Sequence, residues 1–186
     1  MAVLMNRSIL LLFLTFGVSI TNAKAQQHIE RLGQVTFFSY TSVENIQAVN
    51  NKVLSIIDLE SGKIEVSVLM RAFVFKKSLM KEHFNESYIE SDLYPRARLF
   101  GQITDFDSSI MGSQTRIIKG NFTLRNITKP IEIKAEITKS EKGYTIKGEL
   151  EVKINDYEIN VPPILSPNIA KKIQISFNFQ YKPYEN

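Results

Sequence analysis

Strict alternation of apolar and polar residues is the feature that most constrains what this chain can fold into. It runs through residues 131–138, 144–155 and 173–182. Because neighbouring side chains of a β-strand point to opposite faces, each segment is predicted to be a strand with one buried face. The residues predicted to face inward are Ile131, Ile133, Ala135, Ile137, Tyr144, Ile146, Gly148, Leu150, Val152, Ile154, Ile173, Ile175, Phe177, Phe179 and Tyr181.

Shorter patterns of the same kind predict strands in the first two thirds of the chain. The segments are 35–40, 53–59, 64–74, 98–104 and 115–124. In the third of these, the predicted inward row is Ile64, Val66, Val68, Met70, Ala72 and Val74. About eight antiparallel strands with one apolar face each predict an all-β barrel or sandwich. Lys, Glu and Gln on the other face exclude an outer-membrane barrel, whose outside is apolar.

One segment departs from this period and is predicted to contain a short helical stretch near residues 77–91. Its apolar and aromatic residues recur at helical spacing, namely Leu79, Met80, His83, Phe84, Tyr88 and Ile89. Ser87 and Glu90 have the spacing of a capping box. The proline after Tyr94 pushes that residue out of the helical region, so the chain should return there to an extended conformation.

Residues 1–25 have the features of a secretory signal peptide. A basic residue, an apolar run and a small-residue cleavage site follow one another as Arg7, Ile9–Ile20, Ala23 and Ala25. Cleavage would leave a mature domain of residues 26–186, and translation could start at Met1 or Met5. The run is shorter than the about 20 apolar residues of a spanning helix, which disfavours an uncleaved anchor. With no cysteine in the chain, the mature terminus cannot be that of a lipoprotein.

Charge and motif content argue against several classes of function. The chain has 23 basic and 19 acidic residues, and the bases are scattered, so no nucleic-acid partner is predicted. His28 is expected in a mobile start of the mature chain, far from His83 in sequence, which predicts no metal site. Asp105–Asp107 is predicted to be a polar turn rather than a calcium loop. No catalytic or cofactor-binding motif is present, so no catalytic residue or cofactor is predicted.

Two blocks of the sequence resemble the YceI-like family of secreted, lipocalin-like barrels known as polyisoprenoid-binding proteins. The first block comprises Met80–Phe84, Tyr88–Ile89, Ser91–Pro95 and Phe100. The second is Gly120–Pro130, which is similar to the family's Gly-Asp-Leu-Thr-Ile-Arg-Gly-x-Thr-Lys-Pro signature. Asn126 replaces a turn glycine of the family, and asparagine is among the few other residues that accept a left-handed conformation. The family's Trp and His-Ser pair are missing from the first strand.

The resemblance implies an antiparallel, lipocalin-like barrel that acts as a periplasmic carrier for an isoprenoid or another long-chain amphipathic lipid, with transient membrane contact. An eight-stranded barrel holds either packed side chains or one small ligand. The alternative is therefore a filled barrel that serves as an envelope stress-response or protein-interaction module, and an enzyme ranks third. The predicted ligand-binding residues are Val68, Met70, Met80, His83, Phe84, Leu99, Ile133, Ile146, Phe177 and Phe179.

Two of these expectations concern individual positions. His83 is expected either to make a polar contact at the mouth of a cavity or to be satisfied by a backbone carbonyl. Ala72 and Gly148 are the small members of predicted inward rows, so an open interior would accept phenylalanine at one or both.

Overall fold

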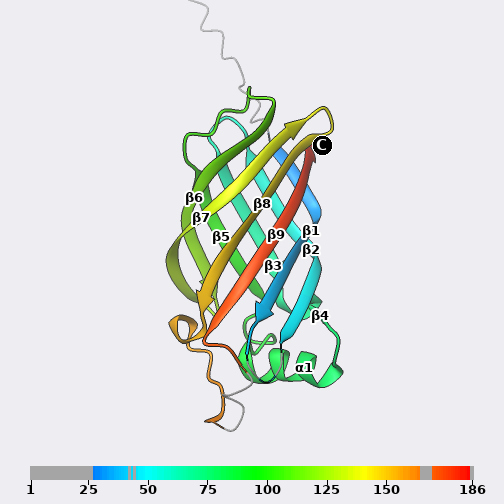
Figure 1. Cartoon of the computed structure of the whole chain (residues 1–186), viewed down its shortest axis with the longest axis vertical. Helices are drawn as coiled ribbons and strands as arrows, with labels where there is room; N and C mark the ends of the chain where they lie inside the picture. Colours follow the sequence, from blue (N-terminus) through cyan, green and yellow to red (C-terminus); the bar gives the residue numbers. More distant parts are fainter. Residues whose placement is uncertain (1–26, 42, 44, 164–168, 185–186) are drawn as a thin grey trace, which may run out of the picture.

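Eight long antiparallel strands close into a barrel in the computed structural model of the chain (Figure 1). Their order is β1-β9-β8-β7-β6-β5-β3-β2, and β2 pairs with β1 to close the ring. The strands are β1 (Gln27–Ser39), β2 (Ile46–Asp58), β3 (Lys63–Leu69), β5 (Arg96–Ile103), β6 (Gly112–Leu124), β7 (Ile127–Ser140), β8 (Gly143–Lys153) and β9 (Lys172–Pro183). The two-residue strand β4 (Val74–Phe75) pairs with β2 outside the ring. The predicted all-β antiparallel barrel is confirmed.

The structure describes residues 27–41, 43, 45–163 and 169–184. The predicted signal peptide, residues 1–25, lies outside these ranges.

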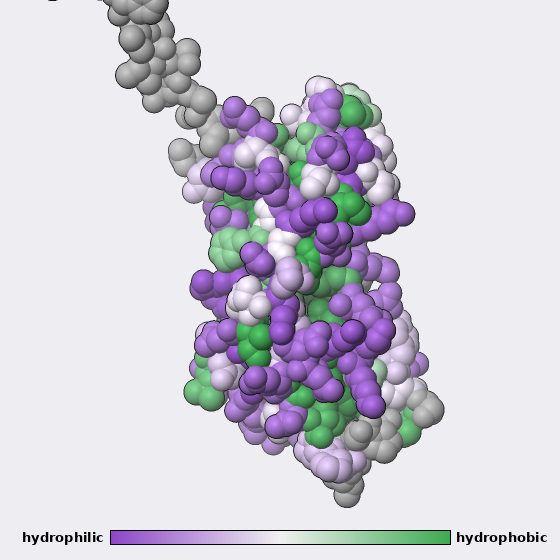
Figure 2. All heavy atoms as spheres, turned by 90° about the vertical axis from the view of Figure 1, so that its left-hand side faces the viewer, coloured by the Kyte–Doolittle hydropathy of each residue, from purple (hydrophilic) through white to green (hydrophobic). Residues whose placement is uncertain are grey.

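The predicted inward faces of β7, β8 and β9 are confirmed. Ile133, Ala135 and Ile137 are buried on β7, and the polar residues between them are exposed. On β8 and β9, every predicted inward residue is buried or half-buried. Figure 2 shows one face of the barrel from outside, which is mostly hydrophilic with scattered hydrophobic residues.

The predicted inward row of the third segment is wrong after Met70. Strand β3 ends at Leu69, and a 3-10 turn η1 (Met70–Ala72) follows. This turn changes which side chains point inward, so that Phe73 is buried and Val74 is 66% exposed. Ala72 is half-buried and does not belong to an inward strand row.

The expectation that His28 lies in a mobile segment is also wrong. His28 is buried in β1, and its ring packs edge-on against that of Tyr144 with centroids 5.4 Å apart. The pairing of β1 with β2 shifts register on both sides of Gly33. Such bulges interrupt the alternation of side chains, which is why the pattern predicted only the second half of β1.

The predicted helical stretch lies across one end of the barrel, as the short helix α1 (Ser78–His83) and the π-helical turn η2 (Phe84–Tyr88) (Figure 1). The capping-box prediction is wrong because Ser87 lies inside η2, while α1 starts after Lys77 without a side-chain cap. The end of the barrel next to α1 also holds the turn between β6 and β7 and the 3-10 turn η3 (Ile154–Tyr157).

That β6–β7 turn consists of Arg125 and Asn126, with φ of 49° and 60°. Two central residues with positive φ are the signature of a type I′ hairpin. Asn126 therefore takes the left-handed conformation expected of it.

The opposite end of the barrel is closed by the loop between β5 and β6. The Tyr144 hydroxyl donates to the carbonyl of Ser108 (2.8 Å), and Gln114 Nε2 donates to that of Asp107 (2.8 Å). Below this loop, the hydroxyls of Ser55 and Tyr181 form a fully buried hydrogen bond of 2.6 Å across the interior. Burial raises the pKa of the Tyr181 phenol, because the charged form would lose its hydration.

Candidate ligand-binding cavity

An apolar cavity of about 170 Å³ occupies the half of the barrel nearest α1. The surface that it exposes is formed by apolar atoms, although Ser39 and Arg98 are among its lining residues; no Asp, Glu or His of the described chain lines it. The lining includes Val35, Phe37, Ile64, Val66, Val68, Met70, Phe73, Phe75, Met80, Phe84, Tyr88, Ile89, Ala97, Leu99, Ile118, Phe122, Leu124, Ile131, Ile133, Leu150, Ile154, Ile159, Ile173, Ile175, Phe177 and Phe179. The cavity thus suits an apolar ligand.

The cavity is deep because its walls run along several strands. On β6 the lining extends from Ile118 to Leu124, and on β9 from Ile173 to Phe179. At a rise of about 3.4 Å per residue, each stretch covers roughly 20 Å of strand. The strands of such barrels tilt by about 40° to the axis, so the depth along the axis is roughly 15 Å. A narrow space of this depth suits a chain rather than a compact molecule.

The floor of the cavity is set by the filled half of the barrel. Phe179 lines the cavity, but Tyr181, the next inward residue on β9, does not. Ile57, Ile137 and Ile146 are likewise fully buried and lie outside the lining. The barrel is therefore half filled and half hollow.

An aromatic cluster closes the cavity at the end next to α1. The ring of Phe84, from η2, stacks on that of Phe37 with centroids 5.4 Å apart. Phe73 and Phe75 flank both rings at centroid distances of 5.1–5.6 Å. Each such pair stabilises by about 0.5–1.5 kcal/mol beyond the area that it buries. These contacts hold η2 against β1 and β4.

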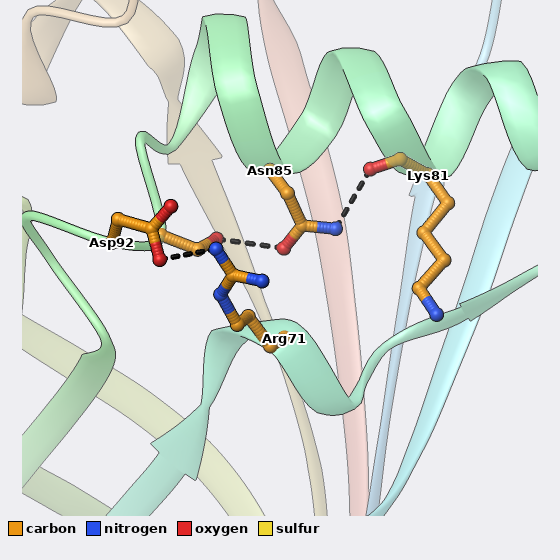
Figure 3. Close-up of polar contacts among 5 residues, drawn as sticks. Arg71, Lys81, Asn85 and Asp92 are labelled. Carbon is orange, nitrogen blue, oxygen red and sulfur yellow. Dashed lines mark hydrogen bonds and ion pairs between the residues drawn. The ribbon is translucent and has the colours of Figure 1, made fainter.

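Polar contacts fix the chain that leads from η2 back to β5 (Figure 3). Asn85 donates through Nδ2 to the carbonyl of Lys81 (2.7 Å) and accepts from the hydroxyl of the buried Ser91 (2.8 Å). An ion pair joins Arg71 to Asp92 in the same region, with both side chains largely exposed to solvent. Exposed ion pairs contribute little, so the Asn85–Ser91 contact is the stronger constraint.

Eight of the ten predicted ligand-binding residues line this cavity: Val68, Met70, Met80, Phe84, Leu99, Ile133, Phe177 and Phe179. Ile146 faces inward but lies in the filled half. His83 is half-buried outside the lining, with its ring 6.5 Å from that of Tyr88. Whether the eight contact a lipid stays a prediction.

Neither of the two small positions named above, Ala72 and Gly148, lines the cavity. Ala72 is in η1 and does not line the cavity. Gly148 faces inward, but a Cβ at this position would lie 2.6 Å from Cζ of Phe177. Among the small residues, the cavity is lined instead by Ala97 on β5.

Sequence reasoning missed the aromatic residues Phe37, Phe73 and Phe75. Phe37 lies in a segment predicted to be a strand, but no long alternating row showed which of its faces points inward. Phe73 and Phe75 lie beyond the 3-10 turn, which reverses the expected parity.

In the described part of the chain, none of the helices is long and apolar enough to cross a membrane. In the same residues, no three His, Asp or Glu side chains are grouped as potential metal ligands.

Three solved structures have similar folds at low sequence identity. A polyisoprenoid binding domain from Saccharophagus degradans, implicated in plant cell wall breakdown, has a TM-score of 0.73 at 12% identity, covering 87% of this chain and 100% of its own. BcnA from Burkholderia cenocepacia has a TM-score of 0.67 at 13% identity, with coverage of 78% and 94%. The YceI protein of Campylobacter jejuni has a TM-score of 0.63 at 14% identity, with coverage of 79% and 90%.

These likenesses support the fold. No curated protein is significantly similar in sequence. The model of the YceI-like domain family, however, matches residues 21–181, which include strands β1 to β8 and all but the last two residues of β9. The chain therefore belongs to the YceI-like family.

Proposed function

We propose that the protein binds an isoprenoid or another long-chain lipid in the apolar cavity and carries it through the periplasm. The observation that carries this proposal is a deep, entirely apolar cavity that ends at a filled floor. The similar fold of a protein described as a polyisoprenoid binding domain supports it. A completely filled barrel, the alternative considered above, would have no such cavity, so lipid binding is the better-supported function.

The energetics of apolar binding suit a carrier. Each methylene group removed from water contributes about 0.8 kcal/mol. A bilayer offers a lipid chain the same apolar surroundings, so transfer between membrane and cavity is close to balance. The protein would therefore keep the chain out of water and still release it to a membrane.

Transient membrane contact would be made by the end of the barrel that holds α1. Val74, Leu79 and Leu93 are 66%, 55% and 68% exposed in the segment that covers the cavity. Lys76 and Lys81 are exposed nearby. Exposed apolar side chains flanked by lysines favour the surface of an anionic membrane.

Secretion to the periplasm is the part of the proposal that depends on residues 1–25. We expect the protein from an envelope fraction to begin at Gln26, because small residues at positions 23 and 25 suit signal peptidase. N-terminal sequencing measures this directly. A mature protein that begins at Met1 or Met5 would contradict both cleavage and the periplasmic location.

Lipid binding is tested by mass spectrometry of an organic extract of the purified protein, compared with a matched variant pair. Ala97→Phe places a ring in the cavity, whereas Ala135→Phe places one in the buried wall outside the lining. We expect Ala97→Phe to lose most bound lipid with little change in Tm. Ala135→Phe should lose about 1–3 kcal/mol of stability through overpacking.

This pair of variants distinguishes lipid binding from the filled-barrel alternative. Undiminished lipid in Ala97→Phe, or an extract of the wild type without long-chain lipid, would contradict the proposed ligand site. Severe unfolding of both variants would favour the filled-barrel alternative.

A further inference from the structure

Arg125, in the β6–β7 turn, joins three segments at the end of the barrel that holds the cavity. Its guanidinium donates through Nη1 to the carbonyls of Tyr157 (3.2 Å) and Glu158, and Nη2 pairs with the carboxylate of Glu90. The Arg125 guanidinium also lies over the ring of Tyr94, with Cζ 5.2 Å from its centroid. Only 13% of the Arg125 side chain is exposed, so these contacts are largely shielded from water.

The residues that meet at this junction have unfavourable backbone conformations. Glu90, Arg125 and Glu158 have φ of 54°, 49° and 52°. Non-glycine residues rarely adopt this left-handed region, and they remain there only where surrounding contacts hold them. The guanidinium supplies contacts of this kind to two segments that are distant in sequence.

The three left-handed residues of the junction directly adjoin the cavity lining. Leu124 precedes Arg125, Ile89 precedes Glu90, and Ile159 follows Glu158, and all three neighbours line the cavity. A chain leaving through this end would pass beside the segments that the junction joins. The charge of the guanidinium strengthens its hydrogen bonds to the Glu90 carboxylate and to the carbonyls.

We propose that Arg125 is a positioning residue that holds these segments together and thereby sets how long a bound lipid stays in the cavity. This inference rests on the proposed function. Uptake and release would require the guanidinium to separate from Glu90, from the carbonyls of η3, or from both. The aromatic cluster around Phe84 remains as a second, apolar closure.

The test variant is Arg125→Asn. Asparagine tolerates the left-handed conformation and suits a type I′ turn, so the turn itself should survive while the three-way contact is lost. Glu90→Gln keeps the shape of the acceptor and removes its charge. The matched control is Arg116→Ala on β6, because Arg116 donates through Nε to the carbonyl of Asp105 (2.6 Å) at the end of the barrel that the β5–β6 loop covers. Asp105 is also left-handed, with φ of 53°.

The first readout is the release of dansylaminoundecanoic acid into an excess of phosphatidylglycerol vesicles, followed by stopped-flow fluorescence. We expect Arg125→Asn to release the probe about tenfold faster, which corresponds to losing roughly one charge-assisted hydrogen bond. Glu90→Gln should show a smaller increase, and Arg116→Ala should match the wild type.

The second readout is hydrogen exchange of the ligand-free protein. Arg125→Asn should raise exchange in residues 84–94 and 154–160 while exchange in strands β7 to β9 stays unchanged. Equal release rates together with unchanged exchange would overturn the proposal and leave Arg125 a turn residue only. If the wild type takes up no probe, the proposed lipid function fails, and the exchange result still decides whether Arg125 holds the segments together.

Discussion

Gly120→Ala should unfold the barrel or weaken it by about 4 kcal/mol or more, a loss typical of severe core defects. Gly120 on β6 lies directly opposite Gly101 on β5. A Cβ at position 120 would lie 2.4 Å from the carbonyl oxygen of Phe100 and 2.6 Å from Cα of Gly101. Both are backbone atoms, so the two strands would have to separate to make room. Urea unfolding followed by circular dichroism measures the loss.

Gly101→Ala is the matched control for this prediction. Its Cβ would meet Cγ2 of Ile118 and the carbonyl oxygen of Lys119 at 3.1 Å each. Small shifts relieve such contacts, so we expect a loss of about 1–2 kcal/mol, in the ordinary range for a point substitution. Equal losses for the two glycines would show that the close approach at Gly120 is not what requires a glycine there.

Ile146→Lys should cost several kcal/mol, because it places a charge in the filled half of the barrel with no partner. Ile146 is fully buried on β8, and the residue paired with it on β9 is Phe179. The matched control is Glu151→Lys on the outer face of the same strand. It loses the ion pair of Glu151 with Lys172, but both side chains are more than half exposed, so the change should be within about 1 kcal/mol.

A third lysine substitution, Leu150→Lys, should destabilise the barrel to an intermediate extent. Leu150 lines the cavity from β8, four residues nearer than Ile146 to the end of the strand that leads into η3. A lysine there has space for its stem and can direct its ammonium group towards water at the mouth. We therefore expect its Tm to lie between those of Ile146→Lys and Glu151→Lys. Identical melting temperatures for all three would contradict the assignment of inward and outward faces.

Regular strands made the fold predictable from the sequence. Strands β7, β8 and β9 are long, uninterrupted and buried on one face, so alternation identified them and their inward residues together. The prediction failed where the backbone leaves this regular geometry, as it does at the bulge around Gly33 and at the 3-10 turn after Leu69. A change of one residue in phase reverses the faces, which accounts for Phe73 and Val74.

The sequence predicted which residues face the interior of the barrel, but not which of them line the cavity. Ile133 and Ile146 both face inward, yet only Ile133 lines the cavity. The two residues lie at different levels of the barrel, and side chains from other strands fill the level of Ile146 but not that of Ile133. That level depends on contacts such as the one between Ser55 and Tyr181, which are 126 residues apart in the chain. No local pattern in the sequence reports a contact of this kind.

The buried hydrogen bond between Ser55 and Tyr181 helps to fix how far the cavity extends into the barrel. This bond lies beyond the last lining residue of β9 and belongs to the packed part of the fold. The floor of the cavity should therefore stay at the same depth whichever ligand is bound. Lengthening the cavity would require rebuilding the core, whereas its opposite end is closed by short turns and side chains. If the proposed lipid is inserted to this depth, any excess length and its polar head would lie beside α1. Every bound chain would therefore reach the same depth in the barrel. Ligands of different length would differ only in the part that extends past the end next to α1.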